Sequence, residues 1–233
     1  MNESPDDLFL IPKRITMSET IADSVAKAIA IGVLAPDERV KETELAARVG
    51  VSRAPIREAL KILHAQGIVT ADSSRGFRVV SFDDKTIEKV LEARLALEAI
   101  LLRDAIVFWR ENDPNASALE GPISRMREAA ANNDRAASLE ADLSFHRAIS
   151  KAAQNNIVQI LWSAIERHVM IIFSLKRYRA DDIHAVISHH EKFRDFIRAQ
   201  IAGDLQPEAL REELENHLLQ VSRMRSAMAA KEG

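Results

Sequence analysis

Acidic and histidine side chains that are distant in the chain have the chemistry of a metal site. Asp142 and His146 are four residues apart in EADLSFHRAIS, so on a helix both project from one face. Further histidines lie at His189 and His190 in ISHHEKF and at His217 in ENHLLQ. Three imidazoles and one carboxylate suit Zn²⁺, Ni²⁺ or Mn²⁺, and a five- or six-coordinate ion keeps positions open for a ligand. The same spacing is common on solvated helix faces, so spacing alone leaves both interpretations open.

A second group with chemical potential is a pair of arginines in VSRAPIREAL, residues 51–60. Ser52 is a good N-cap and Pro55 falls in the first turn, where a missing N–H costs nothing, so we expect a helix to begin here. Arg53 and Arg57 then lie on one side of it, opposite an apolar stripe of Ile56, Leu60 and Leu63. A guanidinium can donate to guanine O6 and N7 or hold a phosphate. The alternative is an amphipathic core helix with solvated arginines.

The flanking segments favour DNA binding. Upstream, Thr43 to Val49 is a short amphipathic stretch that Thr43 can cap and that Gly50 ends with a left-handed turn. Downstream, Gly67 closes the arginine helix, and two weakly alternating strands, 68–71 and 77–80, enclose the turn DSSRG. This order predicts a winged helix-turn-helix. Arg75 and Gly76 at the wing tip suit a phosphate or the minor groove.

The segment from Ile15 to Val80 resembles the N-terminal domain of the GntR family of bacterial transcriptional regulators, most clearly in IGVLAPDERVKETELAARVGVSRAPIREALKILHAQGIVTADSSRGFRVV. The resemblance implies a first helix at Ser18 to Ile31 and double-stranded DNA as the partner. One departure is Asp37, where the family commonly has Gly after Pro36. The expected DNA-binding residues are Thr43, Ser52, Arg53, Ala54, Pro55, Arg57, Arg75 and Gly76.

Composition is consistent with this interpretation. The chain has 233 residues, 47% of them hydrophobic, which can fill two cores, and it has no cysteine, which excludes disulfides and allows a reducing cytoplasm. The formal net charge is −3, yet residues 39–82 hold eight basic side chains against four acidic ones. The expected DNA-binding surface is therefore locally basic. No run approaches the roughly 20 apolar residues that span a bilayer, so we expect a cytoplasmic protein without membrane contact.

After residue 82, helical periodicity continues to the end of the chain. We expect a mainly α protein: a winged helix-turn-helix domain at residues 1–81, followed at residues 82–233 by an all-α six-helix bundle. The six predicted helices run from Asp84 to Trp109, Asn115 to Ala131, Asp134 to Ala153, Asn155 to Leu175, Asp181 to Ile201 and Pro207 to Ala229. The domain boundary is expected near Ser81.

This second half resembles the FCD ligand-binding domain of the FadR-type branch of GntR regulators, and its six helices are closest to the VanR-like subgroup. The likeness rests on Arg94 and Glu98 in EARLALE, on Asp142, His146 and Asn155 in DLSFHRAISKAAQN, and on His190 and His217. It implies one divalent metal bound by Asp142, His146, His190 and His217, with a small organic acid completing the coordination near Arg94 and Asn155. A Gly-Asp pair, Gly203 and Asp204, comes about three residues late, so the last hairpin differs from the family pattern.

Two choices within this site stay open. His190 places Phe193, Phe196 and Ile197 at +3, +6 and +7, which fits an apolar helix face, while His189 is the alternate ligand. A guanidinium buried in a helical domain needs a partner, so Arg94 is expected either to bind the effector carboxylate or to pair with Glu98.

The expected mechanism is that of a regulator. A homodimer reads a short palindrome with Arg53 and Arg57, and acid binding at the metal changes the spacing of the wings. The GntR resemblance implies half-sites with GT and its complement AC. Two alternatives are a metal-dependent enzyme fused to a DNA-binding module, and a regulator whose closed Zn²⁺ site is purely structural.

Overall fold

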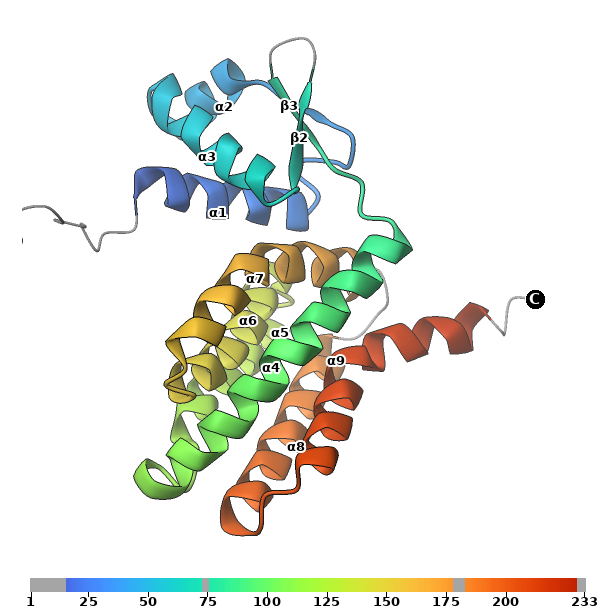
Figure 1. The fold of residues 1–233 in the computed structure, drawn as a ribbon. Coiled ribbons are helices and arrows are strands. Elements are labelled where there is room, and N and C mark those ends of the chain that lie inside the picture. Colours follow the sequence, from blue (N-terminus) through green and yellow to red (C-terminus); the bar gives the residue numbers. More distant parts are fainter. Residues whose placement is uncertain (1–15, 73–75, 178–182, 230–233) are drawn as a thin grey trace, which may run out of the picture.

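The computed structural model describes residues 16–72, 76–177 and 183–229, and within these ranges the side chains of residues 175–177 and 219–229 are not described. Its N-terminal part is a winged helix (Figure 1). A three-stranded antiparallel sheet of order β1-β3-β2 lies beside three helices. The elements are α1 (Met17–Ala30), β1 (Arg39–Val40), α2 (Glu42–Val49), α3 (Arg53–Ala65), β2 (Val69–Asp72) and β3 (Gly76–Val79).

Local details of this domain depart from expectation. α2 begins at Glu42 after the N-cap Lys41, so Thr43 lies inside the helix and does not cap it. Ser52 does occupy the N-cap position of α3, but its side chain makes no capping hydrogen bond. The short strand β1 was not predicted. Gly50 adopts the expected left-handed conformation, with φ of 76°.

The turn at Asp37 keeps the backbone shape that glycine usually provides. Asp37 has φ of 63°, and Glu38 N donates to Ala35 O at 3.1 Å across the turn. Aspartate is one of the few residues that tolerate this region. The departure from the family pattern therefore does not change the sign of φ at this position.

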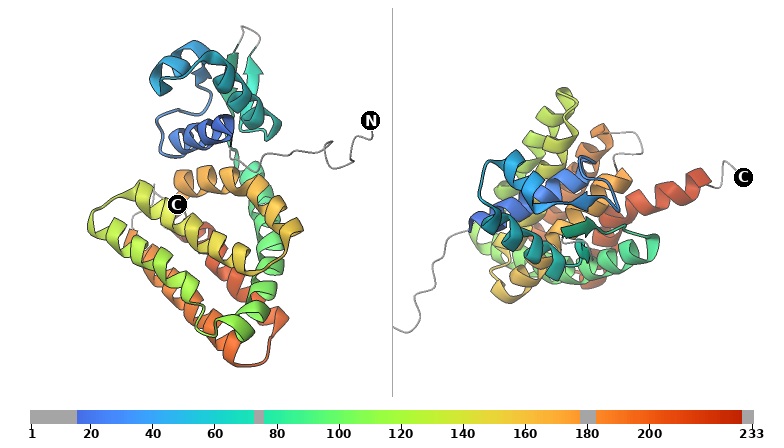
Figure 2. Two further views of the ribbon diagram at one scale, coloured as in Figure 1. Left: turned by 90° about the vertical axis from the view of Figure 1, so that its left-hand side faces the viewer. Right: turned by 90° about the horizontal axis from the view of Figure 1, so that it is seen from above.

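The C-terminal part consists of helices, and all six predicted ones are present (Figures 1 and 2). The first runs about one turn further than expected, to Asn112, and the second starts with the short 3₁₀ segment η2. The elements are α4 (Asp84–Asn112), η2 (Ser117–Leu119), α5 (Glu120–Ala131), α6 (Arg135–Ala152), α7 (Asn156–Arg177), α8 (Ile183–Ala202) and α9 (Pro207–Ala229).

Two hydrophobic cores hold the molecule together, and one of them joins its two parts. In that core Ile21, Val25 and Ile29 of α1 pack in the same cluster as Met170 and Phe173 of α7. The second core lies inside the helical bundle, among α4, α5, α6, α8 and α9, and includes Trp162 of α7. Figure 1 shows α1 lying directly above the orange C-terminal part of α7. The winged helix therefore rests on the bundle through apolar contact.

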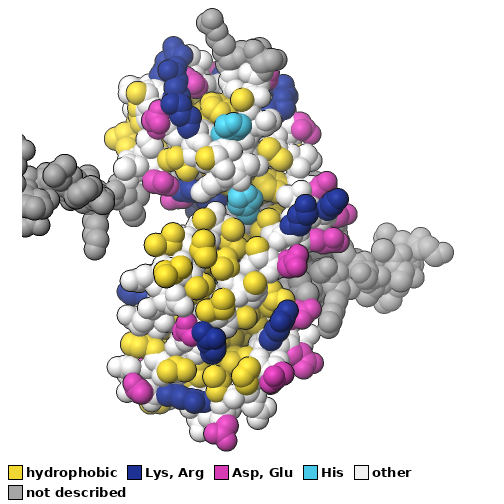
Figure 3. Space-filling model, viewed as in Figure 1, with side chains coloured by type: hydrophobic (Ala, Val, Ile, Leu, Met, Phe, Trp, Pro, Cys, Tyr) yellow, Lys and Arg dark blue, Asp and Glu magenta, His cyan; other side chains and the backbone are white. Residues whose placement is uncertain are grey.

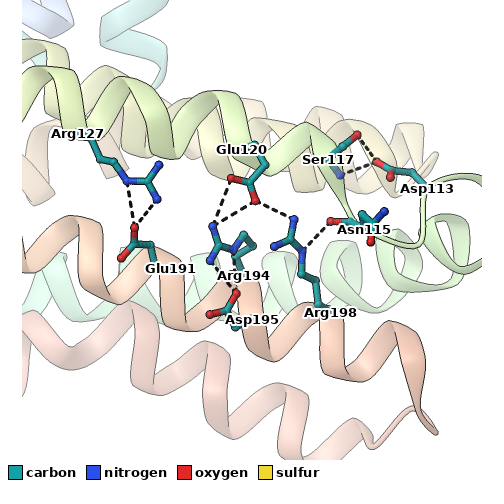
Figure 4. Close-up of polar contacts among 9 residues, drawn as sticks. All are labelled: Asp113, Asn115, Ser117, Glu120, Arg127, Glu191, Arg194, Asp195 and Arg198. Carbon is teal, nitrogen blue, oxygen red and sulfur yellow. Dashed lines mark hydrogen bonds and ion pairs between the residues drawn. The ribbon is translucent and has the colours of Figure 1, made fainter.

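Helix α8 has a charged outer side and an apolar inner side. Ion pairs connect it to α5: Arg127 to Glu191, and Arg194 and Arg198 to Glu120 (Figure 4). On the inner side its buried residues are Val186, His190, Phe193, Ile197 and Ile201. This division fixes the rotation of α8, and with it the direction of His190.

Among the described residues, one helix, α7, is long enough and apolar enough by composition to cross a membrane. Its residues Asn156–Ser174 have a mean hydropathy of 1.3. Core helices of soluble proteins can have the same length and hydropathy. Of this stretch, 44% is buried within the molecule. The side facing the molecule packs on α1 and α4, and several large apolar side chains on the other side are exposed.

Candidate nucleic-acid interface and histidine cluster

The two arginines of the N-terminal domain point away from its core. Ile56, Leu60 and Leu63 on α3 are completely buried. The side chains of Arg53 and Arg57, one turn apart on the other side of α3, are 60% and 51% exposed. Ser52 and Ala54 are exposed beside them, and so is Thr43 on α2. The helix thus presents cations to solvent at its N-terminus, where the helix dipole also favours anions.

Both arginines contact one carboxylate that sequence reasoning missed. Glu42, the first residue of α2, accepts from Arg57 Nη2 at 2.9 Å and from Arg57 Nε at 3.1 Å. Arg53 Nη2 lies 3.5 Å from the same carboxylate. The hydrogen bonds from Arg57 lower the pKa of Glu42, so the group stays ionised. No sequence spacing connects Glu42 to α3, because the contact depends on the helix crossing.

The wing is only partly described. Arg75 lies outside the described residues, so its predicted contact stays a prediction. Gly76 begins β3, and a Cβ atom there would lie 3.3 Å from the carbonyl oxygen of Val40 on β1. The close approach of β1 therefore gives a structural reason for glycine at this position, in addition to the predicted role at the wing tip.

Inside the bundle three histidines from three helices converge. His146 on α6, His190 on α8 and His217 on α9 each offer a ring nitrogen, and these nitrogens all lie within 4.8 Å of one another. His190 Nε2 is 3.1 Å from Asp142 Oδ1. We call His146, His190 and His217 the histidine cluster. Asp142 approaches it through His190, and His189 is not one of its members.

Neighbouring groups orient two of these rings. His190 Nδ1 is 2.8 Å from the carbonyl oxygen of Val186, and only an Nδ1–H can donate there. His146 Nδ1 is 2.7 Å from Glu98 Oε2, which can likewise accept a hydrogen bond from an Nδ1–H. In neutral imidazole rings both contacts leave Nε2 as the lone-pair nitrogen. Carboxylate and carbonyl partners of this kind commonly fix metal-binding histidines.

Aromatic side chains enclose the cluster. Phe145 meets His190 edge to face at 4.9 Å between ring centroids, and Phe193 stacks on His217 at 4.2 Å. Asp142, His146 and His190 are nearly inaccessible to solvent. Buried polar groups need partners, so these rings and this carboxylate have a strong requirement for a shared proton or cation.

Glu98 connects the cluster to Arg94. Its carboxylate accepts from Arg94 Nε at 2.6 Å and from Trp162 Nε1 at 3.0 Å, while its other oxygen faces His146. Burial alone would raise the pKa of Glu98, but the charges and hydrogen bonds of Arg94 and His146 lower it to about 2. Glu98 is therefore ionised at neutral pH. The sequence indicated Glu98 as part of the family pattern and as a possible partner of Arg94, but it did not predict the contact with Trp162.

Arg94 is completely buried and only part of its guanidinium is used. Its Nε pairs with Glu98, and its Cζ lies 4.5 Å from the centre of the Phe173 ring. Among the described residues, Nη1 and Nη2 have no hydrogen-bond partner. The expected salt bridge to Glu98 is present, yet the terminal nitrogens remain available for an anion.

Asn155 has a different environment from the one expected. Its Nδ2 donates to Asp104 Oδ2 at 2.9 Å, and its Oδ1 accepts from Val158 N at 3.2 Å. Asn155 thus caps the start of α7 and joins it to α4. Neither of these hydrogen bonds connects Asn155 to Arg94 or to the histidine cluster, so its effector role stays a prediction.

Comparison with known proteins agrees with this architecture. Residues 17–79 match the family described as "Bacterial regulatory proteins, gntR family", and residues 89–220 match the FCD domain. A "probable D-xylose utilization operon transcriptional repressor" of Paenarthrobacter nicotinovorans is 31% identical over 205 residues, 88% of this chain and 87% of that protein. The "gluconate operon transcriptional repressor" of Bacillus subtilis is 26% identical over 202 residues, 83% of this chain and 82% of that protein.

A solved structure has the same fold. Escherichia coli McbR/YncC superposes with a TM-score of 0.75 at 17% identity, covering 93% of this chain and all of that one. The matched families and relatives are transcriptional regulators rather than enzymes. The exposed arginines of α3, the enclosed cluster of the bundle and these matches lead to one conclusion: the chain belongs to the GntR family of DNA-binding transcriptional regulators and carries an FCD domain.

Proposed function

We propose that this protein is a cytoplasmic, homodimeric repressor that releases or captures a palindromic operator when a small organic acid binds beside a divalent metal in the FCD domain. The observation that carries the proposal is Arg94: a fully buried guanidinium with two terminal nitrogens lacking partners among the described residues. The operons named for two relatives concern a sugar and a sugar acid, which supports sugar acids and hydroxy acids as the first effectors to test.

The histidine cluster suits the metal. Nε2 of His146 and His190 are lone-pair donors, and Asp142 adds a carboxylate against His190. The ring nitrogens of the cluster lie within 4.8 Å of one another, so one ion could be shared among them. His217 supplies the third imidazole. Bound there, Zn²⁺, Ni²⁺ or Mn²⁺ would attract a ligand oxygen as a Lewis acid.

Arg94 would hold the carboxylate of the acid. Its Nε is fixed by Glu98, and the Phe173 ring covers the guanidinium, so the Nη groups are oriented before any ligand arrives. A bidentate carboxylate matches this fork. Because Glu98 also contacts His146, one buried carboxylate places the anion-binding group and a metal-binding group in fixed relation.

An exposed apolar patch supports the homodimer. It consists of Ile100 and Val107 on α4 and Ile157, Ile160 and Leu161 on α7, with Ile157 75% exposed. Hydrophobic side chains gather on the face over α4 and α7 (Figure 3). Exposed patches of this kind mark association sites, and a second copy would cover it symmetrically and bring two copies of α3 to one palindrome.

Helix α7 is the proposed connection between the acid and the DNA-binding domain. Phe173 touches Arg94, and the next residue, Ser174, donates from Oγ to the carbonyl oxygen of Ala30 at the end of α1. Arg167 on the same helix pairs with Glu19 at 2.5 Å and Asp23 at 2.8 Å, both on α1. An acid that moves the guanidinium of Arg94 would therefore act on a helix that holds α1.

We place the boundary between the two domains near Ser81.

Thermal unfolding with added acids tests the ligand. Metal-loaded protein is scanned against hydroxy, sugar and aromatic acids, and a stabilising acid is then tested on Arg94→Met and on the control Arg103→Met, which alters an exposed arginine of α4. We expect stabilisation of wild type and Arg103→Met, and none of Arg94→Met. Stabilisation that survives in Arg94→Met would place the acid elsewhere. No response to any acid, with metal bound, would favour a structural metal.

A further inference from the structure

The contact between Glu42 and the two arginines of α3 links the two helices of the helix-turn-helix. The carboxylate takes the Nε–Nη2 edge of Arg57, with Nη2 at 2.9 Å from Oε2 and Nε at 3.1 Å from Oε1. Its side chain is only 16% exposed, whereas that of Arg57 is 51% exposed. In this ion pair the carboxylate of Glu42 is therefore largely buried, while the guanidinium of Arg57 is accessible to solvent.

The geometry of guanidinium determines what remains available. Arginine has five N–H donors in a planar fork with two usable edges. With the Nε–Nη2 edge of Arg57 occupied, the Nη1 group and the other hydrogen on Nη2 remain, and they form the end-on edge that can bind two acceptors. Guanine O6 and N7 are two such acceptors in the major groove.

We propose that Glu42 is a positioning residue for sequence recognition: it holds Arg57 on one edge and leaves the other edge aimed at a base. A long exposed arginine loses rotamer entropy when it binds. A fixed guanidinium loses less, and it favours acceptors at one place over the phosphates available all along DNA. Arg53, 3.5 Å from the same carboxylate, is restrained more loosely.

The proposal predicts that Glu42→Gln raises the affinity for any DNA but lowers the preference for the selected sequence. A simple charge effect would only raise the affinity. Glu42→Gln removes one negative charge from the DNA-binding face, so binding to any DNA should tighten. It also weakens the restraint on Arg57, so the preference for the selected sequence should fall. An acid that only competes with DNA for Arg57 would give the first effect without the second.

Matched controls are available on the same helices. Glu44→Gln makes the same charge change in the first turn of α2, but Glu44 pairs with Lys41. Glu58→Gln makes it on α3, where Glu58 pairs with Lys61. These two variants report the charge effect alone.

The experiment uses the full-length protein and two DNA duplexes. A duplex is selected from a random library with wild-type protein, and affinities are measured for it and for a scrambled duplex of equal length at fixed salt. We expect Glu42→Gln to bind the scrambled duplex a few-fold more tightly and to lower the ratio of the two affinities by about fivefold to a hundredfold. Glu44→Gln and Glu58→Gln should keep that ratio within about twofold.

Two results would overturn the proposal. One is an unchanged affinity ratio in Glu42→Gln. The other is an equal loss of the ratio in all three variants, since this would follow from charge alone. Thermal unfolding of the variants guards against a folding defect, and a repeat selection with Glu42→Gln should yield weaker preference at the base pair that Arg57 reads.

Discussion

Arginine occurs in two contrasting environments in this molecule. Arg53 and Arg57 on α3 are more than half exposed and share one carboxylate, whereas Arg94 on α4 is fully buried against Glu98 and Phe173. An exposed guanidinium is hydrated, so leaving it without a protein partner costs little free energy. It is therefore accessible to a large polyanion such as DNA. A buried one requires a specific partner at a fixed place. The same side chain therefore serves DNA binding in one region and the proposed selection of a small ligand in the other.

The largest effect should come from removing an exposed arginine. Arg57→Ala should weaken operator binding by at least about 1–3 kcal/mol for each half-site, and twice that in a dimer. A gel-shift titration at fixed salt measures it, with wild type as reference. Unchanged affinity would mean that α3 is not the helix that contacts the operator, so exposed arginines would not be the DNA-binding class.

The histidine cluster should show a nearly all-or-none change in metal content. Wild type should retain about one divalent ion per chain after dialysis, while His146→Ala and His190→Ala should retain far less. A ligand present at a hundred times its dissociation constant stabilises by about 2.7 kcal/mol, so both variants should also lose metal-dependent stability. The matched control is His189→Ala, the neighbour outside the cluster, which should keep the ion. Loss in His189→Ala with retention in His190→Ala would mean the ligand is His189.

The buried carboxylate of Glu98 should make the stability of the protein depend on pH. Its pKa is lowered to about 2 in the folded state, below the ordinary 4.5, so its ionised form stabilises the fold above pH 4.5. This contribution, about 3 kcal/mol, should disappear as pH falls from 4.5 towards 2. In urea titrations of metal-free protein, the stability gap between wild type and Glu98→Gln should narrow over that window. A gap that stays constant with pH would contradict the ion pair with Arg94.

The smallest effect should come from the exposed ion pairs between α5 and α8 (Figure 4). Arg127 and Glu191 are 2.5 Å apart, but their side chains are 48% and 35% exposed. Arg127→Met should change the free energy of unfolding by less than about 1 kcal/mol. If Arg127→Met and Arg94→Met lowered the free energy of unfolding equally in the same urea titration, solvent exposure would not explain the difference between the two classes of arginine.

The sequence predicts the helices well because their boundaries depend on local chemistry. Gly50, Asp113-Pro114 and Asn132-Asn133 mark ends that the structure places within a few residues. Strand β1 escaped prediction because it is two residues long and exists only through pairing with β3. Thr43 was misassigned as a cap because the helix starts at Glu42, directly after the N-cap Lys41, and not after the first residue that is a good cap.

The site was predictable where its members share one helix. Asp142 and His146 are one turn apart on α6, and Arg94 and Glu98 are one turn apart on α4. Contacts between helices could not be read from spacing: Glu42 with Arg57, and Trp162 with Glu98. The family pattern also has a limit: it includes Asn155, but it did not reveal that Asn155 donates a hydrogen bond to Asp104.

Operator titration with and without a stabilising acid would show whether the buried Arg94 senses an acid while the exposed arginines bind DNA. Metal-loaded wild type should change its operator affinity when the acid is added, by a coupling of about 1–3 kcal/mol. Arg94→Met should keep its metal content and its operator affinity but lose that change. An acid effect of undiminished size in Arg94→Met would contradict the claim.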